Sequence, residues 1–178
     1  VAGTGTVTAA ISNAGLIHAT GSTLLLVGGI TGAGTLAIDP AAKLELNGAT
    51  AQTVAFNPGT LANGTLVGGT LKIDTASNYT GTVTGFAPAD TIDLANLIIS
   101  TASIAGDTLI ANISGGGTQA VALTGAFGAD ILKVTGDGAT GTDLILYRLA
   151  QPSNATPNPL NFGQVHLNAP ETQALAIT

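Results

Sequence analysis

Apolar residues recur two positions apart along most of the chain, with polar residues between them. A period of two places alternate side chains on the same face of a β-strand, so this pattern predicts strands with one buried face. The apolar pairs are Leu36/Ile38, Leu44/Leu46, Val54/Phe56, Leu71/Ile73, Ile92/Leu94, Val121/Leu123 and Leu144/Leu146. No segment keeps the spacing of an amphipathic helix, and we therefore predict an all-β chain with almost no helix.

Turn signals rich in glycine divide this alternation into short, self-similar units. Strand cores recur about every 7–12 residues, a spacing that fits either a β-solenoid or a β-sandwich. The phrase Gly-Thr followed by Leu or Val begins at Gly5, Gly34, Gly64, Gly69 and Gly81. Repeated short units are typical of stacked coils, so we predict a parallel β-solenoid (β-helix) with about 18–28 residues per coil and about six or seven coils.

A β-sandwich of about seven to nine strands is the alternative fold. Sandwich cores usually include large aromatic side chains, whereas this chain has 2 Tyr, 4 Phe and no Trp. The small aliphatic residues suit the narrow interior of a solenoid, and the many Thr and Asn residues can stack on its outer surface from coil to coil. The composition therefore favours the solenoid.

The stretch 32–50, GAGTLAIDPAAKLELNGAT, contains the repeated unit twice. Its alternation turns the leucines and the isoleucine of both copies inward, so Lys43 and Glu45 project outward from one strand. Asp39-Pro40 is expected to form the corner between the two strands. The charged side chains of this stretch therefore belong to a building unit of the fold, and not to a catalytic site.

The sequence pattern changes after Arg148. Residues 1–148 are the predicted β-solenoid repeat domain, and the prolines of residues 149–161 predict a linker or strap, because proline cannot donate to a β-ladder. Residues 162–178 alternate again and predict an extended strand segment, which either joins a neighbouring subunit or opens a further β-domain. The predicted assembly residues of this segment are Phe162, Val165, Leu167, Leu175 and Ile177.

Charge and cysteine content exclude several classes of function. Only 8% of the residues are charged, against roughly 25% in average soluble domains. The 4 Lys and Arg residues cannot form the basic patch that binds nucleic acid. The absence of Cys excludes disulfides, thiolate catalysis and cysteine metal sites. No apolar run approaches the ~20 residues of a membrane span, so we expect neither a nucleic-acid partner nor membrane insertion.

The phrases NAGLIHATGSTLLLVGGITGAGTLAIDPAAKLELNGA (13–49) and GFAPADTIDL (85–94) carry a family resemblance. Residues 1–148 resemble the β-helix repeat regions of bacterial autotransporters and filamentous-haemagglutinin-like surface proteins. The segment 161–178 looks like the first strands of an immunoglobulin-like domain. The resemblance implies a secreted or cell-surface protein used in adhesion, biofilm matrix or fibre formation. Its implied partners are further copies or neighbouring domains of the same protein, and cell-surface or matrix polysaccharide.

The beginning of the sequence fits this expectation of a long parent protein. The first residues lack the charged start and apolar core of a signal peptide, and Val1 already lies within the repetitive pattern. We therefore expect the sequence to be a piece of a longer chain.

Catalytic constellations are sparse. His18 is expected to point outward from a strand in a structural role, and His166 lies far from it in the sequence. The carboxylates Asp90 and Asp93 would suit glycoside hydrolysis only if both converged in one groove with Arg148. Asp90 is expected instead to shape the turn before the strand that carries Asp93. We therefore expect no enzymatic activity, and a carbohydrate-active β-helix enzyme is the alternative.

One short motif points to calcium. GATGTDLIL (138–146) follows the glycine-rich nonapeptide pattern of calcium-binding β-solenoids, with Asp143 at its acidic position and Asp137 just before it. Asp137 and Asp143 are therefore the candidate metal ligands. Because stacked copies share each ion and this chain has one copy, a glycine-rich turn is the preferred interpretation, and no other cofactor is expected.

The leading functional hypothesis is a non-catalytic structural module, a stiff rod in an extracellular or cell-surface bacterial protein of the adhesin or biofilm-matrix type. The alternative in the same class is a self-assembling filament or surface-layer subunit joined by strand addition. In that alternative, residues 162–178 would add a strand to a neighbouring subunit, and deleting residues 151–178 should abolish assembly.

Overall fold

The computed structural model describes residues 1–128 and 130–148. The regular secondary structure of this part is almost entirely β-strand, and its one helical element is the short 3-10 turn η1 (Ala76–Asn78). The strands are β1 (Ala2–Val7), β2 (Ile11–Ser12), β3 (Leu16–Leu26), β4 (Ile30–Thr31), β5 (Thr35–Ile38), β6 (Lys43–Leu46), β7 (Thr53–Phe56), β8 (Thr70–Ile73), β9 (Thr82–Thr84), β10 (Thr91–Leu94), β11 (Ile99–Ala105), β12 (Thr108–Ile113), β13 (Thr118–Thr124), β14 (Asp130–Gly136) and β15 (Thr142–Arg148).

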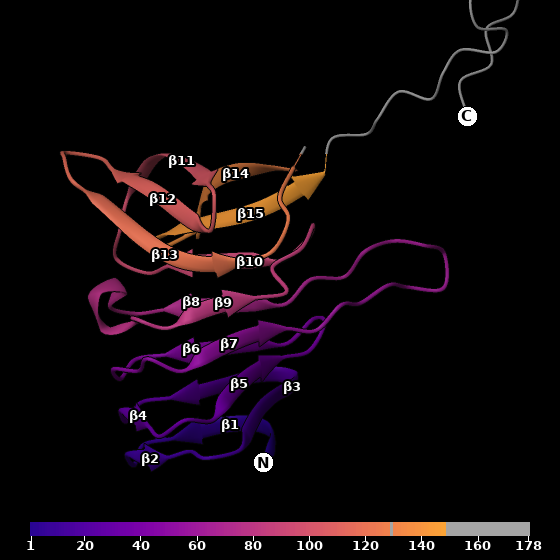
Figure 1. Ribbon diagram of the computed structural model, residues 1–178, viewed down its shortest axis with the longest axis vertical. Coiled ribbons are helices and arrows are strands. Elements are labelled where there is room, and N and C mark those ends of the chain that lie inside the picture. The colour runs from indigo at the N-terminus through magenta and orange to yellow at the C-terminus, as the bar shows by residue number, and fades with distance from the viewer. Residues whose placement is uncertain (129, 149–178) are drawn as a thin grey trace, which may run out of the picture. The chain divides into compact units, whose positions relative to one another are not determined.

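The strands stack in parallel as a β-solenoid with two main ladders (Figure 1). Strand β3 belongs to both ladders, because its first half pairs with β5 and its second half pairs with β6. Gly21, with φ of 72°, lies at the bend between the two halves. One ladder continues through β7 and β9, and the other through β8 and β10. The parallel pairing confirms the solenoid and shows that the sandwich alternative is wrong, because sandwich sheets are antiparallel.

A short third ladder closes each coil. Strand β2 pairs with β4, and isolated bridges continue this side of the stack from Ile30 to Thr50 and from Thr50 to Tyr79. The first coils repeat about every 19 residues, since Leu16 pairs with Thr35 and Thr35 pairs with Thr53. The solenoid has about 5 turns.

The prediction of six or seven coils is therefore wrong, for two physical reasons. The coil between β7 and β8 contains a long loop at residues 57–69, which leaves the stack (Figure 1). After β10 the chain stops coiling and forms antiparallel hairpins over residues 99–148. Both stretches use residues that a uniform repeat would have assigned to further coils.

The interior consists of aliphatic columns in register. Along one ladder, five residues from successive strands lie opposite one another, and all are buried: Leu24, Leu44, Leu71, Ile92 and Leu144. The other ladder has an equivalent buried column: Ile17, Leu36, Val54, Val83 and Leu123. Every apolar pair predicted to point inward is buried. The period of two therefore identified the inner face of each strand correctly.

The last strands complete the two ladders with antiparallel hairpins. On one ladder β13 returns parallel to β9, and β12 and β11 follow it in antiparallel order. On the other ladder β15 runs antiparallel to β10, and β14 pairs antiparallel with β15. Strands β11 and β14 are thus the outermost strands of the sheet among the described residues. Figure 1 shows β11 to β15 at the end of the stack opposite to β1.

Strand β1 forms the other end of the stack. Ala2 and Gly3 pair with the first half of β3, and Gly5 to Val7 pair with its second half, so β1 spans both ladders. Its remaining edge pairs with no described strand. The predicted linker 149–161 and the predicted assembly residues Phe162, Val165, Leu167, Leu175 and Ile177 lie outside the described residues.

Candidate functional site

A polar cluster joins three successive coils at one corner. His18 projects from β3, Asp39 follows β5, and Asn57 follows β7. His18 Nε2 lies 2.7 Å from Asp39 Oδ1, and Asn57 Nδ2 donates to the same oxygen at 2.9 Å. The hydrogen bonds from Asn57 and His18 hold the pKa of Asp39 below its usual value. The corner predicted at Asp39 is confirmed, since Asp39 lies between β5 and β6. His18 is hydrogen-bonded to Asp39 and Asn57, so its ring serves the contact between coils.

A second, buried network joins Asn13, which lies between β2 and β3, to Gln52, which lies between β6 and β7. Asn13 Nδ2 donates to Gln52 Oε1 at 2.8 Å, and Gln52 Nε2 donates to the carbonyls of Asn13 at 3.0 Å and Thr31 at 2.9 Å. Both side chains are buried. Sequence reasoning missed this network, because an Asn and a Gln that lie far apart in the sequence give no signal that they meet.

Charged residues form a rank across the outer face of the second ladder. Glu45, Lys72, Asp93 and Asp143 occupy matching positions on β6, β8, β10 and β15. Lys72 Nζ contacts Glu45 Oε1 at 2.8 Å and Asp74 Oδ1 at 3.2 Å. These contacts raise the pKa of Lys72 to about 12, with Glu45 the larger cause. The outward direction predicted for Glu45 is thus explained by its ion pair with Lys72, which lies on the next coil.

The rank ends in two carboxylates that face each other. Asp93 and Asp143 are directly opposite in the antiparallel pair of β10 and β15. Asp93 is only 5% exposed, and its Oδ1 has no hydrogen-bond partner among the described residues. Burial, followed by repulsion from Asp143 and Asp137, raises the pKa of Asp93 to about 6. The pKa of Asp143 is raised as well, first by burial and then by Asp137.

Two of the side chains proposed for glycoside hydrolysis, Asp90 and Arg148, have other hydrogen-bond partners. Asp90 Oδ1 accepts from the Gly69 N–H and Asp90 Oδ2 from the Ala87 N–H, both at 2.8 Å, so Asp90 shapes its turn as predicted. Arg148 pairs with Asp130, with Nε 2.8 Å from Oδ1. Within the described part of the chain, Asp90, Asp93 and Arg148 share no hydrogen bond or ion pair.

The calcium candidates Asp137 and Asp143 have different surroundings. Asp137 Oδ1 accepts from the N–H groups of Ala139 at 2.7 Å and Gly141 at 3.1 Å, which closes the glycine-rich turn. Asp143 lies on β15, opposite Asp93. Among residues 1–128 and 130–148, no three His, Asp or Glu side chains gather in an arrangement that could hold a metal ion.

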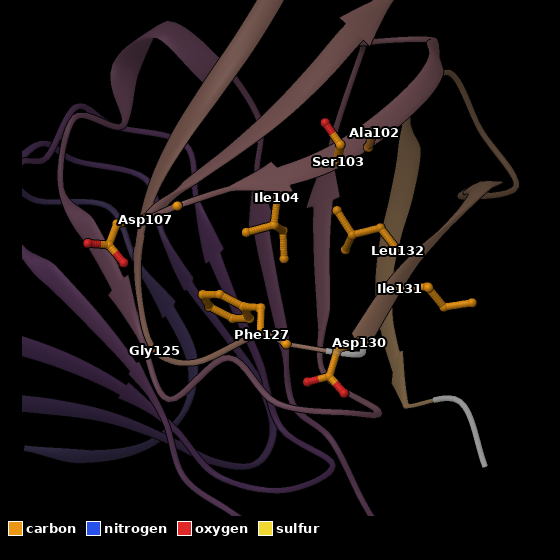
Figure 2. Close-up of a pocket in the computed structure, with 11 residues that line it drawn as sticks. Ala102, Ser103, Ile104, Asp107, Gly125, Phe127, Asp130, Ile131 and Leu132 are labelled. Atoms are coloured by element: carbon orange, nitrogen blue, oxygen red, sulfur yellow. The ribbon is translucent and has the colours of Figure 1, made fainter. Parts of the chain in front are cut away.

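Both ends of the stack contain pockets. At the β11 to β15 end, a pocket of about 660 Å³ lies between β11 and β14. Figure 2 shows Ile104, Phe127 and Leu132 pointing into this pocket, whereas Ile131 points away from it. At the β1 end, a pocket of about 530 Å³ is lined mainly by apolar residues, including Val7, Leu16 and Leu24. The pocket between β11 and β14 is therefore the candidate interaction site within the described part of the chain.

Comparisons with known proteins do not assign a family. No protein-family model and no curated protein matches this sequence. Among the described residues, no helix is long and apolar enough to cross a membrane.

Proposed function

We propose that residues 1–148 are a non-catalytic structural module, a stiff rod within an extracellular or cell-surface bacterial protein. The observation that carries this proposal is the set of in-register aliphatic columns that run through successive coils. Each fully buried Leu or Ile contributes about 1.5–3 kcal/mol of hydrophobic stabilisation. Because every coil packs on the next one, this stabilisation is distributed along the whole stack.

The polar contacts between coils support the same proposal. The cluster of His18, Asp39 and Asn57 and the pair of Asn13 and Gln52 each bond residues from different coils. Lys72 likewise joins its own coil to Glu45 of the preceding one. A catalytic site would bring reactive groups together in a pocket. The polar side chains named above instead form hydrogen bonds and an ion pair between neighbouring coils.

The extracellular location in this proposal rests on the resemblance to surface-protein repeats, and its expected roles are adhesion and biofilm matrix. The proposed partners are neighbouring domains of the same protein and cell-surface or matrix polysaccharide. Antibody labelling of intact source cells tests the location. An antibody epitope within residues 1–148 should be reached from outside without lysis, and detection only after lysis would contradict an extracellular role.

Native proteolysis of the full chain with a broad-specificity protease tests the rod. We expect a protease-resistant fragment whose C-terminal end lies close to Arg148. Early cleavage in the loop at residues 57–69 is compatible with a rod, because this loop lies outside the paired strands. Rapid cleavage within the paired strands β5 to β10 would contradict a rod function. A parallel assay against plant and bacterial polysaccharides tests the enzyme alternative, and cleavage that Asp93→Asn abolishes would replace the structural proposal.

A self-assembling filament is the second candidate function. The specific observation in its favour is that the outer edges of β11 and β14 have no partner among the described strands. Exposed edges are templates for pairing with another chain.

A further inference from the structure

We infer that Asn63, at the tip of the loop at residues 57–69, is a site of spontaneous deamidation, where water converts the side-chain amide into a carboxylate. The chain contains two Asn-Gly dipeptides, Asn47-Gly48 and Asn63-Gly64. Glycine has no Cβ, so its backbone nitrogen can approach the side chain of the preceding Asn with little steric hindrance. The two dipeptides have very different surroundings, and these surroundings select Asn63.

The loop that carries Asn63 has a fixed base and a tip that projects from the stack (Figure 1). Its two sides are joined by an antiparallel bridge between Thr60 and Leu66. At the base, Ala41 N donates to Gly68 O at 2.9 Å, which ties the loop to a coil corner. Residues 61–66 are all exposed. Water therefore has free access to the tip.

The hydrogen bonds at the tip are local. Thr65 N donates to Asn63 Oδ1 at 3.0 Å, and Gly64 N donates to Leu61 O at 2.9 Å. The first of these bonds forms an Asx turn, which spans Gly64 and folds the Asn63 side chain back along the following peptide. Exposed local hydrogen bonds open at little cost in free energy. Opening of the bond to Leu61 frees the Gly64 nitrogen for attack on the neighbouring Cγ of Asn63.

The reaction needs only the chain and water. Hydroxide removes the proton from the Gly64 nitrogen, which then forms a bond to Asn63 Cγ. The Thr65 N–H, which already donates to Oδ1, stabilises the negative charge that develops on this oxygen. The bond between Cγ and Nδ2 breaks, and the nitrogen takes a proton from water and leaves as ammonia. Water then opens the resulting cyclic imide at either carbonyl carbon, which gives aspartate or isoaspartate.

The other dipeptide, Asn47-Gly48, is held by neighbouring coils. Asn47 N donates to Leu26 O at 3.0 Å, and Asn47 Nδ2 donates to Asp74 Oδ2 at 3.0 Å. A Cβ added at Gly48 would lie 2.3 Å from the carbonyl oxygen of Gly28, so the backbones are in close contact there. The attack requires rotation about the bonds of Asn47, and this rotation would break contacts with two other coils. Deamidation at Asn47 should therefore be slow.

Deamidation at Asn63 changes the character of the loop. No Asp, Glu, Lys or Arg occurs between Glu45 and Lys72 in the sequence. Leu61 is 54% exposed and Leu66 is 51% exposed. A carboxylate at Asn63 turns this neutral, partly apolar tip into an acidic one. The reaction does not depend on the proposed rod function, although in a long-lived rod the modified fraction would increase with age.

One tryptic peptide reports on both dipeptides, because Lys43 and Lys72 flank residues 44–72. The same peptide contains Asn57, which precedes a proline. Proline has no backbone N–H and cannot make the attack. Asn57 is therefore an internal negative control.

The experiment uses the purified full chain, folded and incubated in heavy-oxygen water at mildly alkaline pH. Digestion follows in ordinary water, so that deamidation during digestion stays unlabelled. Mass spectrometry locates the heavy oxygen and distinguishes aspartate from isoaspartate. We expect labelling at Asn63 to be at least about tenfold faster than at Asn47, because the tip opens far more readily than the paired coils. Asn57 should remain unlabelled.

A chain unfolded in urea is the matched control for the effect of the fold. Without neighbouring coils, Asn47 and Asn63 should be labelled at similar rates. Thr65→Ala is the control variant at the tip, since it keeps the backbone N–H of position 65 and should keep the rate at Asn63.

Three outcomes would overturn the inference. Equal labelling of Asn47 and Asn63 in the folded chain would show that the fold does not select between them. An unlabelled Asn63 in the folded chain, with both positions labelled in urea, would show that the loop protects its tip. Carbohydrate on Asn63 in material from the source would show that the amide is used in the glycosylation sequence Asn63-Gly64-Thr65 instead. Each of these results would leave the rod function standing, because proteolysis of the stack tests the rod separately.

Discussion

Asp93 on β10 lies directly opposite Asp143 on β15, and Asp93 is almost fully buried there. Like charges in opposite positions of an antiparallel pair destabilise a sheet. The nearest positive group of the same rank, Lys72, already contacts Glu45 and Asp74. This carboxylate pair is consequently a point of electrostatic repulsion on the outer face of the second ladder.

The first prediction concerns stability and pH. Because burial and the neighbouring carboxylates raise the pKa of Asp93 from its usual value of 3.8 to about 6, the folded state binds more protons than the unfolded state between these two values. The free energy of unfolding should then fall as pH rises from about 4 to about 7, by up to about 2–3 kcal/mol for this group. Urea unfolding across this pH range measures the slope.

Asp93→Asn should reduce that slope, whereas Asp90, whose pKa burial also raises to about 6, keeps its own contribution to it. The variant should also stabilise the protein at neutral pH by about 1–2 kcal/mol, because it removes the repulsion with Asp143. Asp107→Asn is the matched control, since Asp107 is exposed in the turn between β11 and β12. It should leave the slope unchanged. An unaltered pH dependence in Asp93→Asn would show that the pair does not govern it.

The second prediction concerns the aliphatic columns. Leu44 is fully buried between Leu24 and Leu71 of the adjacent coils. Leu44→Ala should lower the free energy of unfolding by about 2–5 kcal/mol, because it removes apolar contacts and leaves a cavity. Ile98→Ala is the control, since Ile98 is largely exposed, and it should change stability by less than about 0.5 kcal/mol. Denaturant titration of both variants compares them, and equal effects would argue against a continuous interior.

The third prediction concerns the buried amide network. Gln52→Ala removes four side-chain hydrogen bonds, to Asn13 Nδ2 and to the carbonyls of Asn13, Thr31 and Gly32, although the carbonyls of Asn13 and Thr31 keep a backbone donor. Each such bond contributes about 0.5–1.5 kcal/mol, so we expect a total loss of about 2 kcal/mol or more in the thermal or urea unfolding of this variant. Gln119→Ala, which removes one exposed hydrogen bond, should have little effect. Similar losses in both variants would contradict a special role for Gln52.

The fourth prediction concerns a glycine at a coil corner. A Cβ added at Gly48 would lie 2.3 Å from the carbonyl oxygen of Gly28 in the preceding coil. Gly48→Ala must therefore push the two coils apart, and we expect a loss of about 1–3 kcal/mol with earlier proteolysis near this corner. Gly15→Ala is the control, because a Cβ at Gly15 meets no atom within 4 Å. A Gly48→Ala protein as stable as wild type would show that the corner can relax.

Alternation along the sequence determined which side chains face the interior. It placed Leu36, Leu44 and Ile92 correctly, because inward and outward directions depend only on a strand's local period of two. The corner at Asp39 and the turn at Asp90 were also predictable, since turn residues act on their own neighbourhood.

The tertiary structure alone decided which strands become neighbours and in which direction they run. The pairing of Asp93 with Asp143 and the contact of Asn13 with Gln52 join residues about 40 to 50 positions apart, and no local pattern encodes such a contact. The same holds for the hairpins after β10, whose strands alternate like those of the coils but pair in antiparallel order. A period of two specifies the buried face of a strand, whereas its partner depends on where the rest of the chain has already stacked.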